Sequence, residues 1–160
     1  MGDSLTKENK ELTEKEKVHK KFAIDLFNHT WDLMEKKDRT KEDDDEMIHS
    51  AHASRHHWGQ IGTPTHFERG EWQISRVYAI LNRPDPAIYH ATRCLEICKE
   101  NHIGDWDIAF AYEALARAYN VAGKKTKAKK YLDLGKEAGE KIAKKEDKDY
   151  FLSELEKIAI

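Results

Sequence analysis

Residues 74–78 read ISRVY, and residues 115–119 repeat the pattern as LARAY, 41 positions further along the chain. The small residue Ala87 matches Ala128 at the same spacing. Repeats of 20 to 50 residues are typical of stacked helical units, each of which buries its apolar face against its neighbours. The sequence therefore predicts a stack of similar helical hairpins.

The chain contains seven segments with helical periodicity and no convincing strand. Thr13 and Glu16 form a capping box at the first segment, and Thr63 with Pro64 starts the third. Gly59 is expected to end the second segment, and Asp105 to cap the fifth. Short connections predict antiparallel neighbours. The expected helices span residues 13–37, 42–58, 64–81, 84–102, 106–122, 125–144 and 148–158.

Residues 64–145 resemble the tetratricopeptide repeats, whose unit is two antiparallel helices with small residues at their crossing. The matching residues of the first unit are Ile74, Ser75, Tyr78, Ala87 and Ala91, and those of the second are Leu115, Ala116, Tyr119 and Ala128. The resemblance implies an all-α, right-handed stack of antiparallel helix hairpins. The first two helices can form a degenerate third unit, because Trp31 precedes Trp72 by 41 residues. The family repeat is 34 residues long, so these units are about seven residues longer, and a helical repeat of another kind is the alternative.

The resemblance also implies a concave groove that is lined by one edge of each first helix. Carried over position by position, the lining residues are Arg69, Trp72, Arg76, Phe110, Glu113, Arg117 and Asn120. Arg76 and Arg117 occupy equivalent positions, and their planar forks suit a carboxylate or phosphate. The expected function is an adaptor that binds a peptide or a small anionic ligand. In the alternative, the two arginines pair with Glu113, Glu71 or Asp107 in a structural network.

Histidines form a second candidate site. His49, His52 and His56 share one face of the second expected helix, and His90 lies within reach after folding. Neutral imidazoles suit zinc, nickel or iron ions. The alternative function is therefore a metal-binding protein or a metal-dependent enzyme, although histidines also occur as packing or surface residues.

Glu68, Glu71 and Trp72 follow on the next expected helix, where two carboxyl groups and an aromatic wall would permit acid–base chemistry. The sequence contains no phosphate-binding loop, nucleophile elbow or zinc signature. It therefore assigns no reaction and no definite cofactor.

Composition limits the other possibilities. The 160 residues suit one domain, expected at 13–160 after a disordered polar segment at 1–12. A charged content of 36% and a mean hydropathy of −0.87 argue against a membrane protein, and 28 basic against 30 acidic residues argue against nucleic-acid binding. Cys94 and Cys98 fit buried, reduced thiols in the cytoplasm. A protein partner is expected, and a homo-oligomer is a further possibility.

Overall fold

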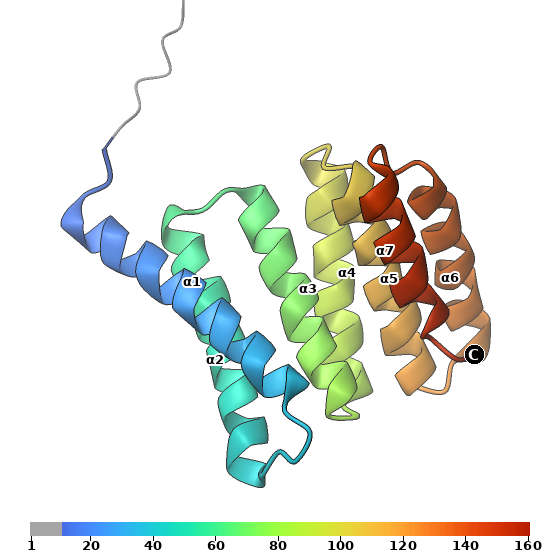
Figure 1. The fold of residues 1–160 in the computed structure, drawn as a ribbon, viewed down its shortest axis with the longest axis horizontal. Helices are drawn as coiled ribbons and strands as arrows, with labels where there is room; N and C mark the ends of the chain where they lie inside the picture. The colour runs from blue at the N-terminus through green and yellow to red at the C-terminus, as the bar shows by residue number, and fades with distance from the viewer. Residues whose placement is uncertain (1–10) are drawn as a thin grey trace, which may run out of the picture.

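The computed structural model describes residues 11–160, which form helices and no β-strand within that range (Figure 1). The helices are α1 (Glu14–Glu35), α2 (Lys41–Ile61), α3 (Pro64–Ile80), α4 (Pro84–Glu100), α5 (Asp105–Val121), α6 (Lys125–Glu140) and α7 (Lys145–Glu156). Within these described residues, no helix has the length and apolarity that crossing a lipid bilayer requires. The prediction of a disordered N-terminus falls largely on residues 1–10, which lie outside the described part.

The helices pack as hairpins, in which α1 pairs with α2, α3 with α4, and α5 with α6. Helix α7 packs on both α5 and α6. Along the stack, α1 contacts α3, α3 contacts α5, and α5 contacts α7. In contrast, α2, α4 and α6 have no Cα atoms within 8 Å of one another in the described chain. Helices α1, α3, α5 and α7 therefore contact one another along one side of the stack, and we call them the inner helices; Figure 1 shows α1 in front of α2 and α7 in front of α5.

Small residues occupy the positions where the helices of a hairpin approach each other. Ser75 and Ala87 are buried between α3 and α4, and the Ser75 hydroxyl donates a hydrogen bond of 2.7 Å to the carbonyl of Ala87. Their equivalents 41 residues later, Ala116 and Ala128, are fully buried. Short side chains allow this close approach. The structure confirms the predicted all-α stack of helix hairpins.

The helix ends agree with the sequence in part. Thr13 and Glu16 form the predicted capping box. The prediction that Gly59 ends the second helix is wrong, because α2 continues to Ile61 and Gly62 is its C-cap. The predicted cap at Asp105 is also wrong, because α5 begins at Asp105 and its N-cap is Gly104. The Asp105 carboxylate instead accepts a hydrogen bond of 2.9 Å from the Ala143 backbone N–H. Asp105 thus connects the start of α5 to the loop before α7.

The last two helices differ from their predicted bounds. Helix α6 ends at Glu140 rather than residue 144, and α7 begins at Lys145 rather than residue 148. The intervening turn buries Ile142, which packs with Phe151 and Leu155 of α7. Burial of this apolar side chain explains why the helical pattern is interrupted there.

Two glycines allow α7 to pack closely on α6. A Cβ atom added at Gly139 would lie 2.6 Å from the Phe151 ring, and one added at Gly135 would lie 3.3 Å from Leu155. Both α7 side chains are buried. The last helix therefore depends on the absence of side chains along one face of α6.

We expect Gly139→Ala to destabilise the fold by about 1–2 kcal/mol, measured by urea unfolding. We expect overpacking to cost about 2–3 kcal/mol, the upper part of the usual range, because the added Cβ atom would lie only 2.6 Å from the Phe151 ring. The roughly 1 kcal/mol by which alanine is favoured over glycine in a helix reduces the net loss to about 1–2 kcal/mol. Gly59→Ala is the control, because a Cβ atom there would meet only the end of the flexible Arg55 side chain, at 3.3 Å. A Gly139→Ala protein as stable as the wild type would contradict close packing of α7.

Candidate binding groove

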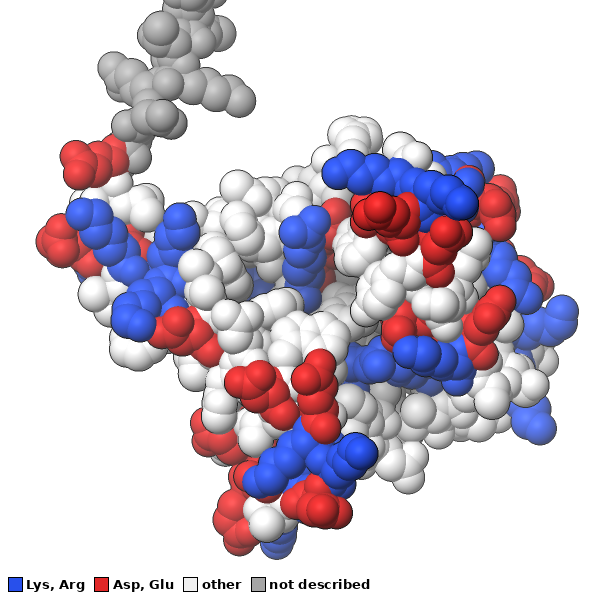
Figure 2. Space-filling view, in the orientation of Figure 1, with Lys and Arg blue, Asp and Glu red and all other residues white. Residues whose placement is uncertain are grey.

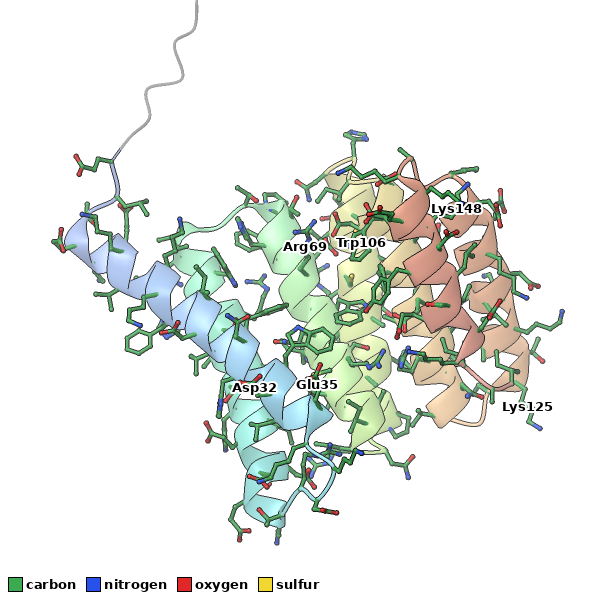
Figure 3. The ribbon with its side chains drawn as sticks, viewed as in Figure 1. Asp32, Glu35, Arg69, Trp106, Lys125 and Lys148 are labelled. Atoms are coloured by element: carbon green, nitrogen blue, oxygen red, sulfur yellow. The ribbon has the colours of Figure 1, made fainter. Side chains whose placement is uncertain are left out.

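The inner helices α1, α3, α5 and α7 surround a hollow in the face of the molecule that Figure 2 shows. A pocket of about 390 Å³ lies in this hollow. We call it the aromatic pocket, and its lining residues are Phe27, Trp31, Glu68, Arg69, Trp72, Trp106, Asp107, Phe110 and Tyr150. Figure 3 shows Arg69 on α3 and Trp106 on α5 in the upper part of this face. All four inner helices therefore contribute to one site.

Aromatic rings form a continuous wall from α1 to α7. The Trp72 ring centroid lies 5.7 Å from that of Trp31 and 5.8 Å from that of Phe110. The Trp106 centroid lies 4.6 Å from that of Phe110 and 5.9 Å from that of Tyr150, on which Trp106 stacks. These are favourable separations for ring pairs. The rings support one another and leave apolar surface facing the pocket.

The groove continues beside α1 in a second pocket of about 170 Å³. This pocket shares Phe27 and Arg69 with the aromatic pocket and is also lined by Trp58 and His66, whose rings stack at 4.0 Å. The two pockets together extend the candidate site along α1. Such an extended site suits a chain segment better than a compact ligand.

Glu68 is a buried acid in the wall of the aromatic pocket, with 2% of its surface exposed. The Cys94 thiol donates to its Oε2 atom at 3.3 Å, whereas Oε1 accepts no hydrogen bond from any described residue. Burial, followed by hydrogen bonding to Asp107, raises the pKa of Glu68 to about 10. The Glu68 carboxyl is therefore neutral at pH 7, and its proton can be donated to Asp107.

The guanidinium group of Arg69 forms a bidentate ion pair with Asp107. Its Nε and Nη2 atoms donate to the Asp107 carboxylate at 2.8 and 3.1 Å. Burial opposes ionisation of Asp107, but the hydrogen bonds from Arg69 and Glu68 lower its pKa. The charges of Arg69 and Asp107 cancel, so the walls of the aromatic pocket have no net charge at neutral pH.

Arg76 and Arg117 share one carboxylate, that of the fully buried Glu113. An Arg76 nitrogen lies 3.6 Å from Glu113 Oε1, to which Arg117 also donates, and the Trp72 indole donates to Oε2 at 3.0 Å. The Nε atoms of both arginines are buried without an acceptor among residues 11–160. Burial and then the charge of Arg117 lower the pKa of Arg76. We call Arg76 and Arg117 the arginine pair. The two guanidinium groups share a single carboxylate, that of Glu113, so the pair carries one positive charge more than its direct partner neutralises.

The structure thus contains the pairing that the sequence left as an alternative, between the arginines and Glu113. Of the other suggested partners, Asp107 binds Arg69, and Glu71 binds Arg55 and His90. Three of the expected groove residues, Arg69, Trp72 and Phe110, line the aromatic pocket. Asn120 does not line the aromatic pocket. Its side-chain amide instead donates a hydrogen bond of 2.9 Å to the carbonyl of Ala159.

The predicted histidine cluster comes together only in part. His52 and His90 have ring centroids 5.3 Å apart. His52 Nε2 lies 2.8 Å from the Tyr78 hydroxyl, and His90 Nδ1 lies 2.6 Å from a Glu71 oxygen. Burial, followed by the charge of His90, lowers the pKa of His52. Each of these two rings therefore already has a polar partner.

His56 packs against His57, with ring centroids 5.5 Å apart. In the described part of the chain, no set of three histidine, cysteine or carboxylate ligand atoms within 4.8 Å of one another includes a histidine. The predicted ligands His49, His52, His56 and His90 are therefore not gathered at one point. A metal site at the histidines stays a prediction.

Phe27, Trp106 and Tyr150 line the aromatic pocket, although none of them was predicted as a site residue. The 41-residue repeat could have predicted two of them, Phe27 and Tyr150. Phe27 lies 41 residues before Glu68, and Tyr150 lies twice that distance after it. Extending the 41-residue register to the terminal helices would have placed both rings beside Glu68.

Comparison with known proteins gives no relative on which to base a function. No model of a protein family matches the chain, and neither curated proteins nor solved structures gave a significant match.

We expect Glu68→Gln to remove a pH-dependent loss of stability. Glu68 ionises near pH 4.5 in the unfolded chain and only near pH 10 in the folded one. As the pH rises through this window, the unfolded state loses its proton first, which lowers wild-type stability by up to about 1.4 kcal/mol per pH unit. The glutamine amide can still donate to Asp107 and accept from Cys94.

The measurement is urea unfolding of both proteins from pH 4.5 to 9, with a chelator present. Glu68→Gln should be more stable than the wild type by up to about 5 kcal/mol at pH 8, and the difference should vanish towards pH 4.5. Glu96→Gln, at an exposed residue, serves as the control. A difference between Glu68→Gln and wild type that is the same at every pH would show that Glu68 is not a neutral buried acid.

Proposed function

We propose that this chain is a protein-binding module, which holds a segment of a partner protein in the groove formed by α1, α3, α5 and α7. The observation on which the proposal rests is the aromatic pocket. Its volume of about 390 Å³ lies within the range of roughly 300–1,000 Å³ typical of ligand sites. Six of its lining residues are aromatic, and such side chains are enriched in protein interfaces.

The pocket is suited to an apolar side chain, preferably an aromatic one. Its charged lining residues, Arg69 and Asp107, neutralise each other, and Glu68 is protonated at pH 7. A charged group entering the pocket would lose its hydration and find no opposite charge available. An aromatic side chain would instead bury its surface against the indoles and gain ring contacts.

The arginine pair is suited to an acidic group of the same segment. Arg76 and Arg117 face the single carboxylate of Glu113, while the nearby Glu154 already binds Lys157 at 2.5 Å. Arg76 also lies over the Trp72 ring, with its guanidinium carbon 5.9 Å from the centroid. Because Trp72 borders both features, the segment would place an acidic residue beside its aromatic one.

The repeat architecture supports a peptide ligand, and we assign the chain to the tetratricopeptide-like class as part of the proposal. The hairpins α3/α4 and α5/α6 place small residues at their crossings, as that class requires. Its first helices line the concave side, as α1, α3, α5 and α7 line the groove here. The 41-residue spacing differs from the 34 residues of the family; because the turn from α4 to α5 spans only residues 101–104, at least part of the difference lies in longer helices.

Selection of peptides tests the proposal without knowledge of the natural partner. The folded chain is used to select from a random peptide library displayed on phage, and the enriched sequences are synthesised. We expect an aromatic or large aliphatic residue close to Asp or Glu. Trp106→Ala should weaken binding of these peptides about tenfold or more, because a central aromatic contact is lost. Fluorescence anisotropy of labelled peptides gives the dissociation constants.

Matched variants distinguish the groove from other surfaces. Tyr89→Ala removes an exposed aromatic ring of α4, outside the aromatic pocket, and should leave affinity unchanged. Arg76→Ala should weaken acidic peptides about tenfold and their amidated analogues much less. All variants are first compared by thermal unfolding. Selected peptides that bind Trp106→Ala as tightly as wild type would exclude the aromatic pocket as the binding site.

A further inference from the structure

Two thiols and a carboxyl group meet in the core beside the aromatic pocket. Cys94 and Cys98 lie one turn apart on α4, and Glu68 reaches them from α3. One ligand atom of each residue lies within 4.8 Å of the other two. All three side chains are buried, and neither cysteine forms a disulfide. No other such group of three occurs among the described residues.

The three side chains are held in place by the helix pair that bears them. Cys94 and Cys98 are both fully buried in the cluster that includes Ala91 and Leu95, so their side chains point into the α3/α4 hairpin and its contact with α5. The Cys94 thiol already contacts Glu68 Oε2 at 3.3 Å. A cation entering this cluster would therefore find its ligands assembled, at little cost in conformational entropy.

Packing alone does not explain the carboxyl group. A buried thiol behaves as a small apolar residue, but a carboxyl group costs free energy in an apolar core unless both of its oxygens have partners. Glu68 Oε1 accepts no hydrogen bond from the residues that the structure describes, although Arg69 lies 3.8 Å away. Without a cation, the protonated carboxyl donates a hydrogen bond to Asp107; a bound cation would replace that proton and would bind the carboxylate and both sulfur atoms together.

We propose that Cys94, Cys98 and Glu68 bind one zinc ion. Zinc accepts thiolate and carboxylate ligands together, whereas magnesium and calcium select oxygen ligands. Three protein ligands leave a fourth position for water or another group. Binding releases the protons of the two thiols and of the carboxyl to the solvent. Because Glu68 also lines the aromatic pocket, the ion would lie at the wall of the groove.

This site is separate from the predicted histidine site, and it does not depend on the proposed peptide function. The histidines His52 and His90 pair instead with Tyr78 and Glu71. A zinc titration with matched variants of the two clusters therefore tells which of them binds metal. The probes are Zn²⁺ and Co²⁺ added to reduced, tag-free protein, both in the native state and during refolding.

The wild type should bind one Zn²⁺ per chain and melt at a higher temperature with it, and the Co²⁺ complex should show the near-ultraviolet absorption of cobalt–thiolate bonds. Cys94→Ser/Cys98→Ser should weaken zinc binding at least roughly 100-fold, because both sulfur ligands are lost. Glu68→Gln should weaken it less. The control His49→Ala/His52→Ala/His56→Ala should retain the wild-type affinity within about twofold.

Wild-type protein that binds no stoichiometric zinc, or whose Co²⁺ complex lacks thiolate absorption, overturns the proposal. The proposal is also overturned if the histidine variant loses zinc binding while the cysteine variant retains the wild-type affinity. If the double serine variant does not fold, the cobalt spectrum of the wild type and the affinity of Cys98→Ala decide the question.

Discussion

The carboxylate of Glu113 is the contact on which the groove depends. It is fully buried on α5, and it is bound by the indole of Trp72, by Arg76 of α3 and by Arg117 of its own helix. A buried charge without partners costs several kcal/mol, so α3 and α5 have to pack where these donors meet. The same contact repeats the 41-residue register, because Trp72 and Glu113 are equivalent residues of adjacent hairpins.

This contact also determines the character of the groove. Its hydrogen bond fixes the Trp72 ring between Trp31 and Phe110, and thus completes the aromatic wall. Along α3, the arginine pair lies on one side of Trp72, where two cations share the single carboxylate of Glu113. On the other side of Trp72, Arg69 and Asp107 neutralise each other beside the protonated Glu68. An apolar centre between a cationic side and a neutral side defines the ligand that we propose.

The 41-residue repeat was sufficient to predict the helix hairpins, because small residues such as Ser75 and Ala116 are required wherever two helices cross closely. It was not sufficient to decide the role of Arg76, because a guanidinium on an inner helix can face a ligand or a buried carboxylate. The position of Trp106 was missed for a related reason, since aromatic residues at helical spacing also occur in cores. The contact of Glu68 with Cys94 depends on how α3 is placed on α4, which periodicity does not specify.

The most direct test of this central contact is the free energy of unfolding of Glu113→Gln, with Glu96→Gln as the matched control. Glu96 pairs with Arg93 on the surface, where an ion pair contributes at most about 1 kcal/mol. We predict that Glu113→Gln loses about 2–3 kcal/mol, because the substitution removes the shared counter-charge of two largely buried arginines. A loss no larger than that of Glu96→Gln would contradict the role of Glu113 in joining the inner helices.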